Sequence, residues 1–284
     1  MSTTIERLIK VLMFDVDGSI MPQGGPIHPA IAAFFRALSK LGLIMGPATG
    51  KNCDYGRGLA CGIGVVWDFV AGESGARFIE CVGKSGPPIY KQRVSQGASS
   101  DLSSFIKKID YDLFGRGFSL RGQIEKFRPE LKEGILTLFP PGRDLDVTLD
   151  WLSHFEDIID TFGFQLKLQR FSDGCIDIVP EGISKQLGVQ EVCRTYKCSP
   201  DQILVVVDGS NDIELTQGTL VIAVANAIPE LKKIATAFEG YVSEKVDGAG
   251  FVEGILHFAE SNKFDASINN KIKALCLATL KKLV

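Results

Sequence analysis

Short apolar runs rich in branched residues recur along the chain. The clearest are residues 11–14 and 203–207, and residues 43–47, 65–70 and 220–224 follow the same pattern. Runs of this length that end in a turn signal predict strands, and the lack of polar alternation is typical of strands buried on both faces. Both faces of a parallel sheet are covered in this way.

Between these runs, apolar residues recur at helical spacing. The pattern predicts helices over 30–41, 52–61, 185–196, 228–237 and 248–259. Strands that alternate with helices predict an α/β fold with a doubly wound parallel sheet. Residues 265–284 alternate apolar residues with lysines and predict an amphipathic helix, which we expect to pack on the core or on a partner subunit.

The pattern changes between residues 83 and 179. A Gly-, Ser- and Pro-rich, hinge-like stretch comes first, at 83–100. Helices are predicted over 101–109 and 146–162, and strands over 123–127, 134–139, 164–168 and 175–179. This order predicts a small antiparallel sheet with helices on one face. We therefore expect an α/β core over 1–82 and 180–262, an inserted α+β cap over 83–179, and a C-terminal helix over 263–284.

Composition narrows the classes of function. The 284 residues include 31 basic and 34 acidic side chains, without a basic patch of the kind that nucleic-acid binders carry. No 18-residue apolar run or N-terminal signal is present, and the seven cysteines form no CxxC pair. We expect a reduced, cytoplasmic protein that binds neither nucleic acid nor membranes. With only three histidines, the sequence does not favour a multi-histidine metal site.

Acidic residues follow the two clearest strands. Asp15 and Asp17 come after the first, and Asp208 and Asp212 come after the second. Ligands bind outside the carboxyl ends of strands in open α/β sheets, so these acids are expected to meet at one edge. Crowded carboxylates repel each other unless a cation relieves them, and Mg²⁺ is the natural cation for such a site.

Other polar residues are predicted to reach the same edge. Thr49, Gly50 and Lys51 follow the strand at 43–47 and form an anion-binding tip, in which the glycine lets backbone N–H groups approach an oxyanion. Lys185 lies in the first turn of a helix, where the macrodipole disfavours a cation unless an anion is near. Carboxylates, a cation, a hydroxyl and a lysine together suit a phosphate group.

Such a site could transfer a phosphoryl group. One carboxylate would attack phosphorus in line and form an aspartyl-phosphate, and a second would act as general acid and base. Phosphate monoester hydrolysis needs acceleration of up to about 10²¹-fold, which a dense cluster of charges can supply.

The spacing of residues along the chain excludes three other kinds of binding site: a calcium loop, a dinucleotide-binding motif and a nucleotide-binding Walker A loop. An EF-hand needs a glutamate at its twelfth position, where counting from Asp15 and Asp208 gives Pro26 and Thr219. A dinucleotide fold needs GxGxxG after its first strand, and this chain has DVDGSI there. A Walker A loop is absent from the sequence.

Four motifs resemble those of the haloacid dehalogenase superfamily, in the family's order and spacing. They are FDVDGS, PATGK, GISK and VVDGSNDIEL, and the resemblance covers residues 8 to about 260. It implies a Rossmann-like core with a mixed α/β cap of the second type. Ser19 and Lys51 depart from the motifs, since threonine and arginine are commoner there, and Lys51 cannot hold phosphate in a bidentate manner.

The resemblance also implies the role of each site residue. Asp15 would be the nucleophile and Asp17 the general acid and base. Mg²⁺ would be held by Asp15, Asp17 through its backbone carbonyl, and Asp208, with Asp212 assigned to the same metal site. The groups that would hold phosphate or support this site are Thr49, Gly50, Lys51, Lys185 and Asn211.

The cap adds a hint about the substrate. Residues 131–144 and 172–185 resemble stretches of phosphomannomutases, and Lys132 and Arg143 fall where basic residues hold a second phosphate in that family. We expect a Mg²⁺-dependent phosphatase for a small phosphorylated metabolite, a sugar phosphate or phosphorylated sugar acid, in a chain that could form a homodimer. The alternatives are a phosphomannomutase-like mutase and a binding module with a vestigial site.

Overall fold

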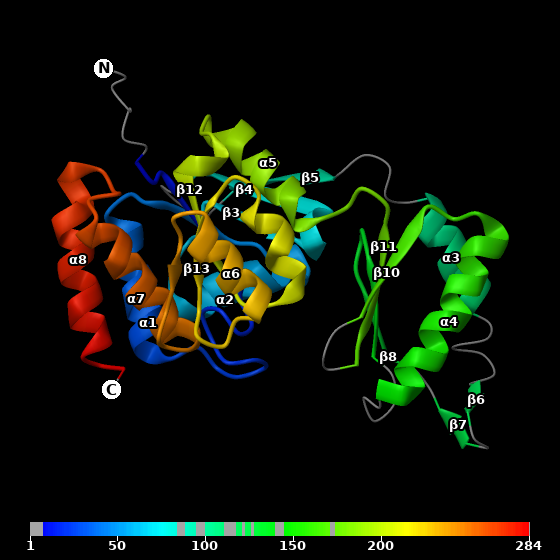
Figure 1. Ribbon diagram of the computed structural model, residues 1–284. Coiled ribbons are helices and arrows are strands. Elements are labelled where there is room, and N and C mark those ends of the chain that lie inside the picture. Colours follow the sequence, from blue (N-terminus) through cyan, green and yellow to red (C-terminus); the bar gives the residue numbers. More distant parts are fainter. Residues whose placement is uncertain are drawn as a thin grey trace. The chain divides into compact units, whose positions relative to one another are not determined.

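The computed structural model describes residues 8–83, 89–94, 100–110, 118–120, 123–125, 128–139, 145–170 and 174–283. The chain divides into two compact units, shown in Figure 1. The core unit comprises residues 1–93 and 184–284, and the insert unit comprises residues 94–183.

A parallel five-stranded sheet forms the centre of the core unit. Its strands, in spatial order, are β14 (Tyr241–Val242), β13 (Leu220–Ala223), β12 (Ile203–Val207), β1 (Val11–Phe14) and β2 (Ile44–Pro47). Every residue of β1 and β12 has an exposed fraction of 0%, which explains why both strands are apolar without alternation. Because β1 pairs with β12 on one side and β2 on the other, the carboxyl ends of these two strands flank that of β1.

Helices cover this sheet. They are α1 (Pro29–Lys40), α2 (Cys53–Ile63), α5 (Lys185–Tyr196), α6 (Pro229–Ala237), α7 (Asp247–Glu260) and α8 (Ala266–Leu280). Phe14 of β1 packs against Phe35 and Phe251, with ring centroids 5.0 and 6.0 Å away, so α1 and α7 are fixed on the central strand. The C-terminal helix α8 packs against α7 and α1 of its own chain.

A second sheet, in which the first two strands are antiparallel, extends the core unit. It contains β3 (Phe69–Gly72), β4 (Arg77–Gly83) and β5 (Ile89–Val94). The bridge between Ala48 and Ala71 connects β3 to the chain that leaves β2. The interpretation of residues 83–100 as a hinge was wrong for β5: polar residues in IYKQRV hide the strand, whose position beside β4 is a tertiary effect.

The insert unit contains a four-stranded antiparallel sheet in the order β10 (Leu166–Arg170), β11 (Ile176–Pro180), β9 (Leu136–Phe139) and β8 (Arg128–Leu131). Helices α3 (Ser100–Asp110) and α4 (Leu145–Phe162) supply Phe105, Trp151 and Phe155 to a core that also includes apolar residues of β9, β10 and β11.

One strand prediction in this unit needs correction. The predicted strand 123–127 is β7 (Gln123–Glu125), which pairs with β6 (Phe118–Leu120) in a separate hairpin. The strand that pairs with β9 is β8. Short polar strands carry little periodicity, so pairing decides their bounds.

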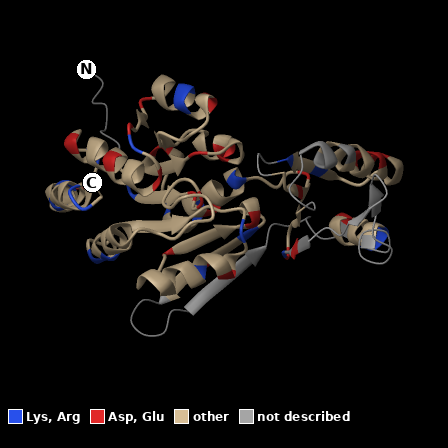
Figure 2. Ribbon diagram, turned by 90° about the horizontal axis from the view of Figure 1, so that it is seen from below, with Lys and Arg blue, Asp and Glu red and all other residues tan. Residues whose placement is uncertain are grey.

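In the described part of the chain, no helix combines the length and the apolar character needed to cross a membrane. Lysines and arginines are interspersed with acidic residues along the described ribbon (Figure 2), which agrees with the small formal net charge of −3.

Candidate active site

A buried lysine joins two of the predicted acids. Lys185 Nζ lies 2.6 Å from Asp15 Oδ1 and 2.6 Å from Asp212 Oδ1. Asp15 follows β1, Lys185 opens α5, and Asp212 lies in the short 3₁₀ helix Ser210–Thr216 after β12. Their exposed fractions are 8%, 2% and 0%, so these charges interact where solvent screening is weak. The two carboxylates also offset the unfavourable macrodipole at the start of α5.

Each carboxylate oxygen of Asp212 has partners. Oδ1 accepts from Lys185, and Oδ2 accepts from the backbone N–H groups of Asp208 and Gly209, at 3.1 and 3.2 Å. Asp212 therefore orients both the lysine and the turn that carries Asp208.

Asp208 faces the turn after β1. Ser19 Oγ donates to Asp208 Oδ1 at 2.9 Å, and Ser19 is fully buried. Gly18 has a φ of +85°, and a Cβ atom there would lie 2.2 Å from Asp208 Oδ2. Only glycine permits this backbone conformation and this close approach together. The glycine of the DVDGS motif therefore lets the two acidic turns meet.

Asp15, Asp208 and Asp212 can each offer an oxygen to one point, since these oxygens lie within 4.8 Å of one another. Burial raises the pKa of Asp15 despite the nearby Lys185. Burial, reinforced by Asp212, raises the pKa of Asp208 to about 7. When ionised, three carboxylates beside one lysine have an excess charge of −2, which a divalent cation would neutralise. Oxygen donors of this kind fit Mg²⁺.

Asp17 and the Thr49–Lys51 tip lie at the same edge of the sheet. Asp17 Oδ1 accepts from the N–H of Gly24 at 3.2 Å, so its side chain is directed at the loop before α1. Thr49 is 3% exposed, and its Oγ1 accepts from the N–H of Lys51 at 3.1 Å. The Phe14 carbonyl accepts from Ala48 N at 2.8 Å, which connects this tip directly to the end of β1.

The turn Glu73–Gly75 lies between the tip and α5. Glu73 N donates to Lys51 O at 2.8 Å, and Ser74 N donates to Thr49 O at 3.1 Å. A Cβ at Gly75 would lie 2.1 Å from Ser184 O, immediately before Lys185. None of the four motifs includes this turn, so no local pattern predicted its part in the site.

Of the remaining predicted residues, Asn211 makes no side-chain hydrogen bond to Asp15, Lys185 or Asp212 in the described part of the chain. Asn211 is half-buried beside Gly209, where a Cβ would lie 2.7 Å from Asn211 Oδ1.

Lys132 belongs to the insert unit: its side chain is 3% exposed and its Nζ donates to Thr137 Oγ1 at 2.6 Å. Thr137 Oγ1 is in turn 2.5 Å from Asp177 Oδ1. Lys132 thus contacts its own sheet, and its role toward a substrate stays a prediction. Arg143 lies outside the described residues.

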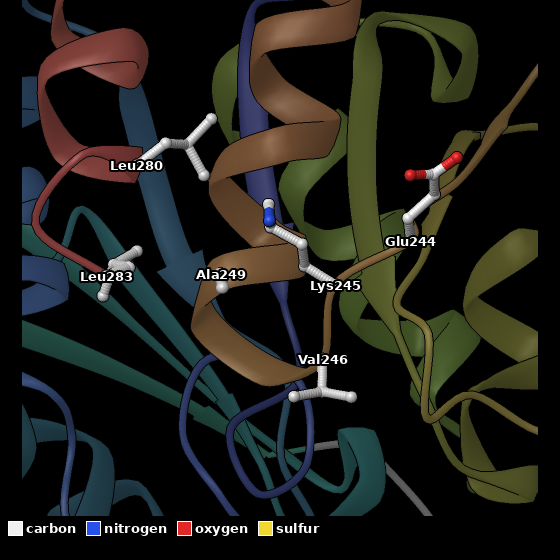
Figure 3. Close-up of a pocket in the computed structure, with 6 residues that line it drawn as sticks. All are labelled: Glu244, Lys245, Val246, Ala249, Leu280 and Leu283. Carbon is white, nitrogen blue, oxygen red and sulfur yellow. The ribbon is translucent and has the colours of Figure 1, made fainter.

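A surface pocket elsewhere in the core unit includes none of the predicted site residues. Figure 3 shows it between the start of α7 and the end of α8, lined by Glu244, Lys245, Val246, Ala249, Leu280 and Leu283.

Comparisons with known proteins agree with the motifs. A family profile for haloacid dehalogenase-like hydrolases matches residues 136–252. A phosphoglycolate phosphatase of Methanopyrus kandleri is 24% identical over 238 residues, which cover 80% of this chain and 89% of that protein. A phosphoglycolate phosphatase of Natronomonas pharaonis is 25% identical over 255 residues, which cover 88% of this chain and 96% of that protein.

Solved structures share the fold. A Thermoplasma acidophilum protein matches with a TM-score of 0.66 at 18% identity, covering 88% of this chain and 98% of that one. The sucrose-phosphatase of Synechocystis, in complex with sucrose and phosphate, matches with a TM-score of 0.59 at 19% identity, covering 89% of this chain and 98% of that one. The four motifs and the Rossmann-like core with its inserted unit thus resemble those of the haloacid dehalogenase-like hydrolases, whose family profile matches residues 136–252.

Proposed function

We propose that this protein is a Mg²⁺-dependent phosphatase that hydrolyses a small phosphorylated metabolite through an aspartyl-phosphate on Asp15. The observation that carries the proposal is the buried Lys185, whose Nζ is 2.6 Å from both Asp15 and Asp212. A lysine held beside a carboxylate at the carboxyl edge of a parallel sheet provides a nucleophile and a phosphate-binding cation in one place.

Two residues would carry the bond changes. An oxygen of Asp15 attacks phosphorus and the bond from phosphorus to the ester oxygen breaks, while Asp17 gives its proton to the departing alkoxide. Asp17 then takes a proton from water, whose oxygen attacks the same phosphorus. The bond from phosphorus to Asp15 breaks, and orthophosphate leaves. The turn after β1 places Asp17 two residues from the nucleophile, which suits a single group acting as acid and then base.

The surrounding residues would bind and orient the phosphoryl group. Lys185 and Thr49 would hold its oxygens, with Gly50 and Lys51 completing the anion-binding tip. Asp212 would keep Lys185 in place, because its Oδ1 accepts from Nζ and its Oδ2 is fixed by two backbone amides. A preorganised set of donors of this kind stabilises charge in the transition state without reorganising.

Asp15, the Asp17 carbonyl and Asp208 would hold Mg²⁺, with Asp212 next to them. The bound cation would supply Lewis-acid stabilisation of the phosphoryl oxygens. The three ionised carboxylates carry more negative charge than Lys185 can neutralise, and this imbalance supports the assignment of a cation.

A sugar phosphate or a phosphorylated sugar acid is the proposed substrate class. Relatives named phosphoglycolate phosphatase, similar over most of their length, favour a small phosphorylated acid. Lys132 Nζ donates to Thr137 within its own sheet, and contact of Lys132 with a second anion on the substrate stays a prediction.

The test is release of orthophosphate from a panel of phosphorylated small acids and sugars with Mg²⁺, comparing the natural protein with Asp15→Asn. The proposal expects turnover of at least one compound and its loss in the variant. Full activity in Asp15→Asn would refute it. Isomerised sugar phosphate from mannose 1-phosphate with a bisphosphate activator, in place of free orthophosphate, would instead establish a mutase.

A further inference from the structure

The loop between β13 and α6 contacts both acidic turns of the site. Asn226 Nδ2 donates to the carbonyl of Gly18 at 2.7 Å, across 208 residues of sequence. Two residues later, the N–H of Ile228 donates to the carbonyl of Asp208 at 3.0 Å. One short loop therefore holds the backbone on each side of the predicted cation position.

The same asparagine is anchored on its other side. Asn226 Oδ1 accepts from the N–H of Asp247, the first residue of α7, at 3.0 Å. Asp247 has a φ of +46°, a conformation that L side chains rarely adopt and that its surroundings must enforce. At the next position, a Cβ on Gly248 would lie 2.7 Å from Ile20 O, so α7 begins directly against the turn after β1.

The turn Asp17–Gly18–Ser19 has little room to shift relative to Asp208. Gly18 lies so close to Asp208 that a Cβ would fall 2.2 Å from a carboxylate oxygen, and Ser19 donates to the same carboxylate. Mg²⁺ demands near-ideal octahedral geometry at about 2.0–2.1 Å, so small displacements of its ligands weaken binding.

We infer that Asn226 is a positioning residue for the cation site: its amide holds the Asp17–Gly18–Ser19 turn against α7 and so fixes that turn opposite Asp208. The inference rests on the proposed function, and it assigns a role to a residue outside the four motifs. Partners that orient metal ligands typically account for about 10- to 100-fold in metal affinity. Because Asn226 makes one bond to the turn, we expect the lower end of this range.

The test is Mg²⁺ binding to the full chain by titration calorimetry, comparing the natural protein with Asn226→Ala. The dissociation constant is expected to rise about tenfold. The fold should survive, because Asn226 is exposed and water can replace its partners. Phosphatase activity of Asn226→Ala should return toward the natural level as Mg²⁺ is raised to saturation. An unchanged dissociation constant would overturn the inference.

Asn269→Ala is the matched control. Asn269 also bridges backbone groups, donating to Ala259 O at 2.8 Å and accepting from Phe264 N at 3.3 Å, but it belongs to α8 and joins that helix to the end of α7. It should lower stability and leave Mg²⁺ affinity unchanged; an equal loss of affinity would mean that Asn226 acts only through stability.

Asn226→Asp isolates the bond to Gly18, because the acceptor for Asp247 is kept. Its added negative charge favours a cation, so weaker Mg²⁺ binding would support positioning, and equal or tighter binding would overturn it. Absence of Mg²⁺ binding by the natural protein would refute the proposed function itself, which separates the two failures.

Discussion

Replacing Lys185 by methionine tests the electrostatic centre of the site. The side chains are similar in length, but the variant leaves Asp15 and Asp212 without the cation that is 2.6 Å from each. Removing one partner from a buried ion pair costs about 3–5 kcal/mol, because the remaining charge stays desolvated. Domains of ordinary stability unfold with about 5–15 kcal/mol, so this loss is a large fraction of the total.

The assay is urea unfolding followed by tryptophan fluorescence. The chain has two tryptophans, and Trp67 is buried in the core unit, whereas Trp151 belongs to the insert unit. A Trp151→Phe background therefore makes the signal report on the unit that contains Lys185. Catalysis should fall as well, by at least the roughly 10²–10³-fold found when one oxyanion donor is removed.

Lys273→Met is the control for this change. Lys273 Nζ is 3.9 Å from Glu260, with 42% of its side chain exposed, and exposed pairs contribute about 0–1 kcal/mol. A loss below about 1 kcal/mol in Lys185→Met, no larger than in the control, would refute the view that the buried lysine neutralises the acidic site.

Two further predictions concern stability. Between about pH 4 and pH 7 the folded, metal-free chain binds more protons than the unfolded chain, because the pKa of Asp208 is about 7 against a usual 3.8. The melting temperature in a chelator should therefore fall as pH rises through this window, and Mg²⁺ should stabilise the protein more at pH 7.5 than at pH 5.5. A flat profile in the chelator would contradict this. Ser74→Ala should raise stability by about 1 kcal/mol in urea unfolding, because Ser74 Oγ is buried without a partner among the described residues. A destabilised variant would show that this hydroxyl is paired.

Much of the site was predictable because its chemistry lies next to strands. VLMF and ILVVV have no polar positions, which requires burial on both faces, and each run ends in an acid. The order of the motifs then predicted that Asp15, Lys185, Asp208 and Asp212 meet, and the structure places them together.

Other features depend on contacts between distant segments. β5 was missed because its polar residues hide a strand that lies beside β4. Ser19 departs from the usual motif, and its donation to Asp208 spans 189 residues of sequence. No local pattern could show this, since a hydrogen bond between remote loops leaves no periodicity in sequence.

Local sequence patterns predict the α/β class, the inserted unit and an acidic sheet edge suited to phosphoryl transfer, because burial and strand ends follow from such patterns. The pairing of the charges depends on tertiary contacts: Asp212 accepts from Lys185 and from two backbone amides, and Lys132 donates to Thr137 within its own sheet. Asn226, in a loop outside every motif, joins the turn after β1 to α7. Such roles depend on distances of about 3 Å between segments that only the folded chain brings together.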